Sequence, residues 1–519
     1  MAIEKVDLQK TKRFGKLFLD YLEGKAELRE FYGGTPEIES FKAQIANKKF
    51  AAEKRKILCQ TLEEQYDKLP VTDHVKKNLQ LLAEENTYTI TTGHQLNLFT
   101  GPLYFIYKIV TVINTCRELS AAYPDHNFVP VYWMASEDHD FEEINHFRFN
   151  EKKYTWNTDQ SGAVGHFDLS TFQNFIDAIP GVPDFFKKAY KEQSLADAAR
   201  NYVNHLFGDY GIIVVDADRR ELKQQISDVM TDDLFHHTSK RLVDEQSEKI
   251  NNLGYKTQVS ARSINFFYLA EQLRERIEVK GEKYEVLNSA LTLDKKELVS
   301  LIQKEPEKLS PNVILRPLYQ EKILPNLAYI GGPAEVAYWM QLKTVFDHYE
   351  EAFPILMPRN FGLVVPAYVR KKWDKIGFET AELFTEKHQL LAKTATKYAD
   401  HKIYLNGQVK EVLDLFNSIK EQAQIIDPTL MDHVEAQQAK AKHSLEVIEK
   451  KFIRAEKRQQ SDKLRQMESV LDHLFPNGSL QERTNNFLDF YLENTAFIAQ
   501  LITYFDPFDY RFYVMDNGG

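Results

Sequence analysis

The sequence predicts an α/β protein with a parallel-sheet core, inserted segments and a helical coiled coil toward the carboxyl end. Three observations support this fold class. Residues 87–149 follow the order strand, loop, helix, strand, loop, helix. Residues 211–216 form a short apolar run, which is typical of a buried parallel strand. Between residues 434 and 455, mostly apolar positions recur with alternating spacings of four and three, the pattern of a coiled-coil seam.

The composition indicates a soluble globular protein. The chain has 519 residues, enough for about three domains, with 43% hydrophobic and 27% charged residues. A formal net charge of −10 argues against a broad nucleic-acid surface. Cys59 and Cys116 are too few for a disulfide framework or a cysteine-rich zinc site. Because no signal peptide or membrane-spanning run is evident, we expect a cytoplasmic protein with no membrane or nucleic-acid partner.

The run 87–149 supplies the first two predicted strands. A β-rich segment ends at Gly93, and Gly101-Pro102 opens a long apolar helix, since proline fits the first helical turn. A second apolar strand, 128–135, leads into a polar cluster and then a second predicted helix. Ligands of open α/β sheets bind at the carboxyl ends of the strands. We therefore expect the active site in the loops that follow these two strands.

Residues 86–372 form the expected catalytic core. The strand at 211–216 and a further strand that ends at the glycine pair 331–332 extend the sheet. Less regular, turn-rich stretches predict insertions at about 150–205 and 245–310.

The remaining segments are predicted to be helical. Residues 1–85 carry apolar residues at helical spacing and form a lead-in to the core. Residues 373–475 form the helical coiled-coil domain, in which a helix stopped by Pro428 pairs antiparallel with the 434–455 seam. The seam does not reveal whether further pairing occurs between chains. Residues 476–519 form a helix and an aromatic tail that is too apolar to stay in solution and docks on the core.

An acidic cluster follows the second strand. Glu137, Asp138, His139 and Asp140 stand together, and three adjacent carboxylates repel one another unless a cation lies nearby. A divalent metal, a substrate ammonium group or partner arginines would each supply that charge. A solvated acidic helix start is the alternative without function. We favour a functional cluster because of its place at the sheet edge.

The loop between the first strand and its helix is a candidate anion or nucleotide site. Gly93, His94 and Gln95 precede it, and backbone N–H groups after Gly101 would face a phosphate or carboxylate. The loop lacks the dinucleotide-binding glycine fingerprint and the P-loop lysine. A simple turn in which His94 and Gln95 cap backbone groups is equally compatible with the sequence.

A third candidate wall lies far along the chain. Arg316 stands in an apolar segment, so it forms either a buried pair with Glu321 or a bidentate carboxylate site. Tyr329, the glycine pair 331–332 and Glu335 would complete the wall, because glycine lets a ligand approach the backbone closely.

Three segments together resemble a known family. They are TGHQLNLFTGPLYFIYK, PVYWMASEDHDFEEINH and LRPLYQEKILPNLAYIGGPAEVAYW. In order and spacing they resemble the bacillithiol biosynthesis cysteine-adding enzymes, the BshC family of cysteine ligases, and the resemblance covers essentially the whole chain. It implies a Rossmann-like core similar to class I aminoacyl-tRNA synthetases, with inserted connective segments and a coiled coil used for dimerisation. The family commonly has Gln at the position of His94.

The resemblance also implies an activity. It is the addition of L-cysteine to the amine of glucosaminyl-malate, a carbon–nitrogen bond-forming ligase reaction that gives the low-molecular-weight thiol bacillithiol. The resemblance leaves ATP activation of cysteine open, and no metal is expected. The implied partners are these two small-molecule substrates and a second copy of the chain. The alternatives are another nucleotide-dependent transferase on the same core and a non-catalytic coiled-coil scaffold.

The residues of the three segments are then candidates for three roles. The catalytic candidates are His94, Asp138, His139 and Asp140. The substrate-binding candidates are Gln95, Thr100, Glu137, Asn145, Arg316, Glu321, Tyr329 and Glu335. The nucleotide-binding candidates are Gly93, Gly101, Lys108, Gly331 and Gly332.

Overall fold

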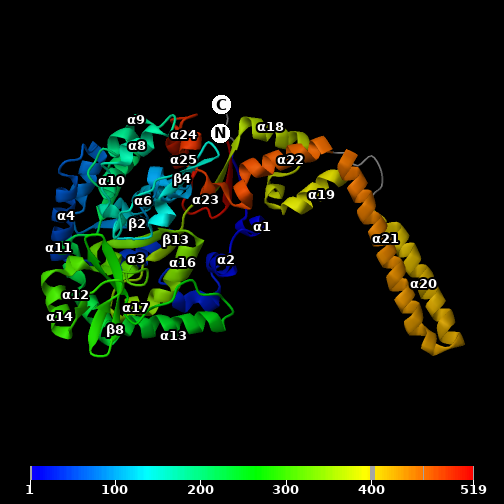
Figure 1. Cartoon of the computed structure of the whole chain (residues 1–519), viewed down its shortest axis with the longest axis horizontal. Coiled ribbons are helices and arrows are strands. Elements are labelled where there is room, and N and C mark those ends of the chain that lie inside the picture. The colour runs from blue at the N-terminus through cyan, green and yellow to red at the C-terminus, as the bar shows by residue number, and fades with distance from the viewer. Residues whose placement is uncertain (1–2, 398–403, 460, 518–519) are drawn as a thin grey trace.

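The computed structural model describes residues 3–397, 404–459 and 461–517. The predicted segments 1–85, 373–475 and 476–519 therefore each include a few residues outside the described ranges. An α/β body carries a long helical arm that projects away from it (Figure 1). Within the described residues, no helix is both long and apolar enough to cross a membrane.

The body is built on a five-stranded sheet in which all neighbouring strands are parallel. Its strands are β2 (Thr87–His94), β3 (Asn127–Met134), β6 (Ile213–Asp216), β12 (Asn326–Gly331) and β13 (Ile355–Pro358). The order is β13-β12-β2-β3-β6, so the chain adds strands first on one side of β2 and later on the other. The predicted parallel-sheet core is confirmed.

The carboxyl ends of the central strands lie level with one another. His94 pairs in register with Met134, which in turn pairs with Asp216. These strands are buried almost throughout, which explains their continuous apolar and β-branched composition. Helix α6 (Tyr104–Ala122) connects β2 to β3 and is buried over most of its circumference. The residues that follow each strand are therefore brought to one edge.

The prediction of a helix after the acidic cluster is wrong. Only a single turn forms there, α7 (Phe141–Ile144), and a hairpin of β4 (His146–Phe149) and β5 (Lys152–Thr155) follows. Phe147 and Phe149 are buried while their neighbours are not, so burial alternates with the period of a strand. The chain reverses at two residues with positive φ, Asn150 and Glu151.

The first insertion continues from this hairpin and is helical. Its helices are α8 (Phe172–Asp177), α9 (Asp184–Ala189) and α10 (Leu195–Phe207). They enclose Phe99, whose ring lies 5.0 Å from the rings of Phe186 and Tyr190. This aromatic packing fixes the loop that follows β2 against the insertion.

The second insertion forms a separate sheet in the order β10-β9-β8-β7-β11. Its strands are β7 (Phe266–Ala270), β8 (Leu273–Lys280), β9 (Lys283–Val286), β10 (Thr292–Leu293) and β11 (Leu309–Pro311). This sheet lies beside α12 and α14 in the body (Figure 1). The helical region after β6 is interrupted at His237, which has φ of 55°.

The other helices of the body cover the two sheets. Before β2 they are α1 (Leu8–Thr11), α2 (Lys16–Leu22), α3 (Ser40–Asn47), α4 (Ala52–Tyr66) and α5 (Asp73–Leu81). Around the second insertion they are α11 (Arg220–Lys223), α12 (Ser227–His236), α13 (Thr238–Asn252) and α14 (Lys295–Lys304). Those near β12 are α15 (Arg316–Ile323), α16 (Pro333–Trp339) and α17 (Lys343–His348).

The arm is the predicted coiled coil. Its long hairpin consists of α20 (Asn406–Ile426) and α21 (Met431–Gln459), which lie side by side (Figure 1). Gln438, the polar member of the seam, donates from Nε2 to the Leu413 carbonyl at 3.3 Å. The hairpin is attached to the body through α18 (Ala367–Ile376), α19 (Lys387–Lys397) and α22 (Ser461–Leu474). The antiparallel pairing of these helices agrees with the predicted fold class.

A small sheet joins the two ends of the chain. β15 (Phe512–Asn517) pairs antiparallel with β1 (Ile3–Val6) and parallel with β14 (Phe361–Pro366). Between the arm and β15 lie α23 (Gln481–Thr484), α24 (Leu488–Tyr491) and α25 (Phe497–Tyr504). The sequence predicted only helices before residue 85, because a four-residue strand with two charged positions leaves almost no periodic signal.

Candidate active site

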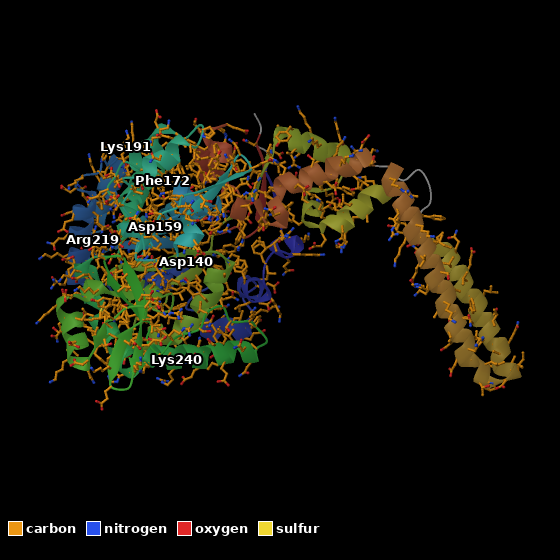
Figure 2. The ribbon with its side chains drawn as sticks, in the orientation of Figure 1. Asp140, Asp159, Phe172, Lys191, Arg219 and Lys240 are labelled. Atoms are coloured by element: carbon orange, nitrogen blue, oxygen red, sulfur yellow. The ribbon has the colours of Figure 1, made fainter. Side chains whose placement is uncertain are left out.

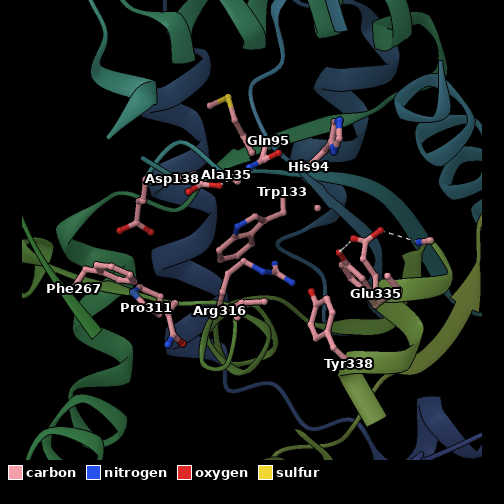
Figure 3. A pocket seen from close by; sticks show the side chains of 18 of the residues that line it. His94, Gln95, Trp133, Ala135, Asp138, Phe267, Pro311, Arg316, Glu335 and Tyr338 are labelled. Carbon is pink, nitrogen blue, oxygen red and sulfur yellow. Dashed lines mark hydrogen bonds between the residues drawn. The ribbon is translucent and has the colours of Figure 1, made fainter. Parts of the chain in front are cut away.

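A cavity of about 650 Å³ opens at the carboxyl edge of the parallel sheet (Figure 3). The end of β2 contributes His94 and Gln95, the end of β3 contributes Trp133, and the segment after β12 contributes Gly332 and Glu335. β12 and β3 flank β2, which is the strand at which the sheet order reverses. Such a switch point is where open α/β sheets bind ligands.

Glu335 organises one wall of the cavity. One of its oxygens accepts from the Tyr329 hydroxyl at 2.6 Å and from Lys108 Nζ at 2.8 Å, and the other accepts from the Gly332 N–H at 2.8 Å. The last bond caps α16, which explains why Pro333 and an acid three residues later open that helix. Burial acts to raise the pKa of Glu335, but Lys108 holds it below its usual value. The pair is therefore ionised.

Lys108 is not a free cation. Its Nζ also donates to the Gly93 carbonyl at 2.9 Å, so the side chain ties α6 to the end of β2. Burial lowers the pKa of Lys108 from its usual value, although Glu335 opposes that effect. The residue lines the cavity, yet its charge is already matched by a carboxylate.

Arg316 lies among aromatic rings. Its guanidinium carbon is 5.6 Å from the ring of Trp133, 5.5 Å from Tyr329 and 5.9 Å from Trp339. Nη1 donates to Gln320 at 3.0 Å, whereas Nη2 is buried and has no hydrogen-bond partner among the residues that the structure describes. A buried donor without a partner is costly, so a ligand oxygen that accepts from it would be bound favourably.

The suggested Arg316–Glu321 pair is wrong. Glu321 is fully buried in the core, where it accepts from Asn326 at 2.7 Å and lies 3.6 Å from Lys48 Nζ. Burial raises the pKa of Glu321 to about 7, with Lys48 opposing. Glu321 is not among the cavity-lining residues, and its cationic partner is too far along the chain for the sequence to reveal.

The acidic cluster has protein cations as its partners. Glu137 lies 2.5 Å from the buried Nζ of Lys223 and lines the cavity. Burial raises the pKa of Glu137, while Lys223 opposes that rise. Within the described ranges, no group of three or more histidine, cysteine or acidic side chains is arranged to hold a metal ion.

Asp138 is oriented from two sides. Gln95 Nε2 donates to it at 2.8 Å, and Arg274 lies 3.9 Å from its other oxygen. Arg274 stacks on the ring of Phe267 at 4.1 Å and contacts His139 Nδ1 at 2.6 Å. Burial, and then Arg274, lower the pKa of His139, so its imidazole is the neutral acceptor in this contact. Asp138 faces the cavity, and His139 supports it from outside.

His94 ends β2 at the cavity wall. Its ring packs 5.4 Å from Tyr104 and 5.1 Å from Phe105, and Nε2 is buried with no partner. Burial, followed by the charges of Lys108 and Arg359, lowers the pKa of His94 well below its usual value. A neutral imidazole with an unpartnered nitrogen can accept or donate a single hydrogen bond to a ligand.

The backbone N–H of Leu103, at the start of α6, has a partner within the chain, contrary to expectation, although the Tyr104 side chain lines the cavity. The Leu103 N–H donates to the Asn485 carbonyl at 2.8 Å, and Asn486 Nδ2 donates to the Phe99 and Gly101 carbonyls at 2.7 Å. The chain segment before α24 therefore occupies the place where a phosphate was expected. Seven candidates are not among the cavity-lining residues: Thr100, Gly101, His139, Asp140 (labelled in Figure 2), Asn145, Glu321 and Gly331.

The structure adds a set of arginines that the sequence did not reveal. Five arginines from outside the three recognised segments line the cavity: Arg262, Arg274, Arg276, Arg359 and Arg483. The sequence offered one signal for them: in the segment LRERIEV, Arg274 and Arg276 are two residues apart, and a strand places such residues on the same face. The other three arginines are far from β2 along the chain, so the sequence alone could not place them in the cavity.

An open parallel sheet with a polar cavity at its switch point defines the Rossmann-like class of α/β enzymes. The family model for the N-terminal Rossmann-like domain of bacillithiol biosynthesis BshC matches residues 1–360. The model for the C-terminal coiled-coil domain of BshC matches residues 362–517. The chain belongs to the BshC family.

Curated relatives agree over nearly the whole length. One from Flavobacterium psychrophilum is 42% identical over 507 residues, which cover 95% of each chain. One from Flavobacterium johnsoniae is 41% identical over 97% of each chain. One from Cytophaga hutchinsonii is 38% identical over 98% of this chain and 97% of the relative. All three carry the name "Putative cysteine ligase BshC".

Proposed function

We propose that the protein joins the carboxyl group of L-cysteine to the amine of glucosaminyl-malate, forming an amide bond in the last step toward bacillithiol. The observation that carries the proposal is one cavity with receptors for both charges: Arg316 with a free Nη2, and the carboxylates of Glu137 and Asp138. Both substrates carry carboxylate and ammonium groups, which these side chains bind in complementary fashion.

The arginines suit the malate portion of the acceptor. A guanidinium binds a carboxylate through two parallel hydrogen bonds, and malate has two carboxylates. Arg316 is the receptor whose guanidinium lies among three aromatic rings, which stabilise its charge and leave a hydrogen-bond donor for the ligand. His94, Glu137 and Asp138 are the groups at the cavity that can accept the proton released by the attacking amine.

ATP activation of cysteine is part of the proposal, because a carboxylate does not react with an amine unless a leaving group replaces its oxygen. The cavity arginines are better placed to bind phosphates than Lys108 and Gly101, which the sequence offers as nucleotide-binding candidates. Lys108 is paired with Glu335, and Gly101 is turned toward Asn486. Among the described residues, no carboxylate forms an ion pair with Arg262, Arg276 or Arg483, which line the same cavity. We expect these three side chains to contact the phosphates.

The direct test is a product assay with the purified protein. L-cysteine and glucosaminyl-malate are incubated with and without ATP, and the thiol product is followed by mass spectrometry. We expect product only with all three components, and phosphorus NMR identifies AMP or ADP as the co-product. Product formation without ATP would contradict the proposed activation of cysteine by ATP and would leave the ligase assignment standing. No product from a folded, dimeric sample with ATP would contradict the ligase assignment.

The proposed assembly is a homodimer in the cytoplasm, formed through the arm. The α20–α21 hairpin exposes large apolar side chains to solvent, a feature that marks interaction surfaces. They are Leu415, Ile419, Ile425, Ile426, Leu430, Val447, Ile448 and Phe452. Pairing within the chain satisfies only part of the seam, and a second arm would cover the rest.

A further inference from the structure

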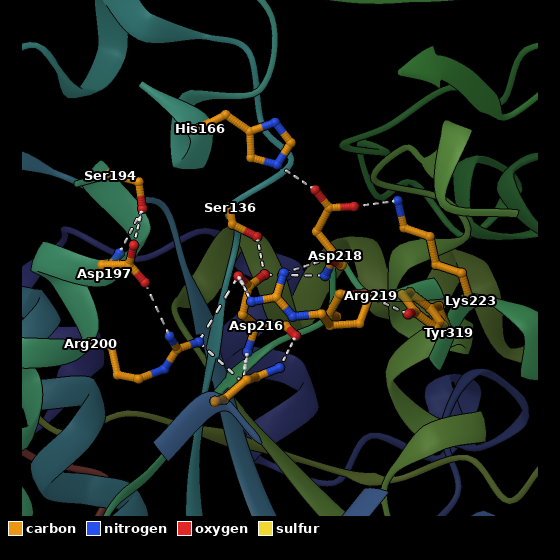
Figure 4. Close-up of polar contacts among 12 residues, drawn as sticks. Ser136, His166, Ser194, Asp197, Arg200, Asp216, Asp218, Arg219, Lys223 and Tyr319 are labelled. Atoms are coloured by element: carbon orange, nitrogen blue, oxygen red, sulfur yellow. Dashed lines mark hydrogen bonds and ion pairs between the residues drawn. The ribbon is translucent and has the colours of Figure 1, made fainter. Parts of the chain in front are cut away.

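A chain of charged side chains leads from the cavity to the protein surface, and Figure 4 shows its outer members, Lys223, Asp218 and His166. Lys223 Nζ lies 2.5 Å from Glu137 Oε1 and 2.7 Å from Asp218 Oδ1. The other Asp218 oxygen lies 2.7 Å from His166 Nε2. The Lys223 side chain is fully buried and that of Asp218 is 6% exposed, whereas that of His166 is 56% exposed.

The chain is part of the fold. Lys223 belongs to α11, Asp218 follows β6, and His166 comes from the first insertion. Lys223 also donates to the Glu307 carbonyl at 2.8 Å, in addition to Asp218 Oδ1. These two hydrogen bonds hold the buried ammonium group in place, and its charge lies beside the Glu137 carboxylate.

The two ends of the chain lie in different cavities. Glu137 lines the large cavity, and His166 lines a smaller one of about 300 Å³ with Asp216 and Arg219. The buried pair of Lys223 and Asp218 separates them. Charge at the solvent-exposed end can thus influence a carboxylate at the cavity without any opening between the two spaces.

We infer that Glu137 accepts the proton of the attacking amine, that Lys223 is a positioning residue that holds its carboxylate ionised and oriented, and that Asp218 and His166 are positioning residues that hold Lys223 in place. This inference rests on the amide-forming function proposed above. In that step the amine lone pair forms a bond to the acyl carbon of an activated cysteine, a phosphate-ester leaving group departs with the bonding electrons, and the surplus N–H proton passes to a Glu137 oxygen.

Glu137 is suited to this role by its surroundings. The charged or titratable groups that face it are Lys223 of α11, Asp218 after β6, Arg274 of β8 and Tyr319 of α15. The Tyr319 hydroxyl donates to the Ala217 carbonyl at 2.7 Å, and burial raises its pKa well above the usual value, so it stays neutral. Burial raises the pKa of Glu137 toward the operating pH, where a carboxylate is a more effective base.

Asp138 is less suited, because both of its oxygens are engaged. Gln95 donates to one oxygen, and the His139 N–H donates to the other at 2.8 Å. Each of its oxygens thus has a donor within the protein that fixes the orientation of the carboxylate. Asp138 therefore serves better as a receptor for the ammonium group of cysteine.

The test is the pH profile of kcat/KM for two variants whose effects oppose each other. Lys223→Met removes the cation that favours ionised Glu137, so the acid limb should move to higher pH by about one unit or more. Asp218→Asn removes the neighbouring carboxylate that disfavours ionisation, so the limb should move to lower pH. The titration of the substrate amine is common to all samples, so a difference between variants reports the protein.

Further variants separate positioning from simple damage to the fold. Lys223→Arg keeps the cation and should bring the acid limb back near that of the wild type. His166→Gln should move the limb slightly to higher pH, while the exposed His236→Gln serves as its matched control with an unchanged profile. Glu137→Gln should lower kcat by roughly 100-fold or more, the range for loss of a general base.

Two outcomes would overturn the inference. One is a wild-type acid limb in both Lys223→Met and Asp218→Asn at reduced rate, which is the behaviour of purely structural residues. The other is near-normal turnover by folded Glu137→Gln. Both outcomes require an active wild-type enzyme, so they leave the ligase function standing. An inactive wild type with all substrates present would instead remove the function on which the inference rests.

Discussion

Arg316 is the residue whose environment says most about the ligand. Three aromatic rings surround the guanidinium, one of its nitrogens is bound by Gln320, and the other has no partner. Aromatic faces stabilise a cation without using its hydrogen-bond donors. The donor that is left over therefore points to an anionic ligand atom, and its loss should weaken substrate binding more than the fold.

Replacing Arg316 by lysine should raise KM for glucosaminyl-malate about tenfold or more, with a smaller effect on thermal stability. Lysine keeps the charge but loses the planar fork that fits a carboxylate, and a charge-assisted hydrogen bond contributes about 1.5–3 kcal/mol. Steady-state kinetics with varied glucosaminyl-malate measure the change. The matched control is Arg465→Lys, a substitution at an exposed position of α22. An unchanged KM would exclude Arg316 from substrate binding.

Glu321 predicts a pH dependence of stability. Its pKa in the folded protein is raised to about 7 by burial, well above that of an exposed glutamate, so its stabilising contribution is complete at low pH and is lost as the pH rises toward and through 7. Gln at this position does not titrate and can still accept from Asn326 and Gln320.

Between pH 5 and pH 8, Glu321→Gln should therefore gain stability relative to the wild type, by about 2 kcal/mol. Urea unfolding followed by tryptophan fluorescence at the two pH values measures the difference. Glu351→Gln removes the other carboxylate that contacts Lys48 and is the matched control. A gain of the same size in that control would assign the effect to Lys48 instead of Glu321.

For single residues, the sequence identified about a third of the cavity lining. The candidates that line it stand at or near the strand ends and helix starts that the sequence marks: Gly93, His94, Gln95, Lys108, Glu137, Asp138, Arg316, Tyr329, Gly332 and Glu335. The sequence could not show that Lys223 neutralises Glu137 or that Glu321 pairs with Lys48. Those pairs join residues far apart in the chain, and only the fold brings them together.

Among the elements, the loop from β2 to α6 is the one whose predicted role changed most. It was expected to present backbone N–H groups to a phosphate, and it instead receives Asn485 and Asn486. Gly101 belongs to this packing. Its φ is 62°, and a Cβ atom there would lie 2.5 Å from Cβ of Asn97.

Gly101→Ala should lower the stability by several kcal/mol, since backbone strain of roughly 1–2 kcal/mol adds to a close contact. Gly181→Ala is the matched control: its φ is 75°, and nothing lies within 4 Å of the added Cβ. Thermal unfolding of both variants separates strain from contact. Because Gly101 does not line the cavity, the folded fraction should keep its KM values. If Gly101→Ala and Gly181→Ala lose the same stability, the close contact between the new Cβ and Asn97 must have been relieved by a local shift.

The elements that the sequence predicted well are those with strong periodicity. β2 is rich in β-branched residues, β3, β6 and α6 are mostly apolar, and the α20–α21 hairpin carries a heptad pattern. The hairpin β4–β5 and the five-stranded sheet of the second insertion were missed. Their strands are short, half-exposed and rich in charge, so burial alternates too briefly to outweigh the helical propensity of their residues.

In the whole molecule, the α20–α21 hairpin of the arm is the part that projects away from the body into solvent. The side chains of α20 and α21 extend into solvent along its length (Figure 2). At its tip, Ile425 and Ile426 are 85% and 77% exposed. Exposed apolar side chains in this number are typical of a surface that another chain covers.

Substituting both Ile425 and Ile426 by lysine should weaken the proposed dimer while leaving the fold of the body unchanged. Sedimentation velocity at micromolar concentration measures the change in mass. Gln424→Lys, an exposed polar neighbour, is the matched control for added charge. A monomeric wild type under the same conditions would contradict the dimer and leave pairing within the hairpin as the only role of the seam.

The sheet that joins β1, β15 and β14 has a consequence for the order in which the fold forms. Ile3 pairs with Met515, so the pairing of β1 with β15 closes a loop that spans most of the described chain. The entropy lost on closing a loop rises with its length, and contacts between residues far apart in sequence slow folding. We therefore expect this sheet to form after the parallel sheet of the body, and β15 to be the strand on which both β1 and β14 depend for a neighbour.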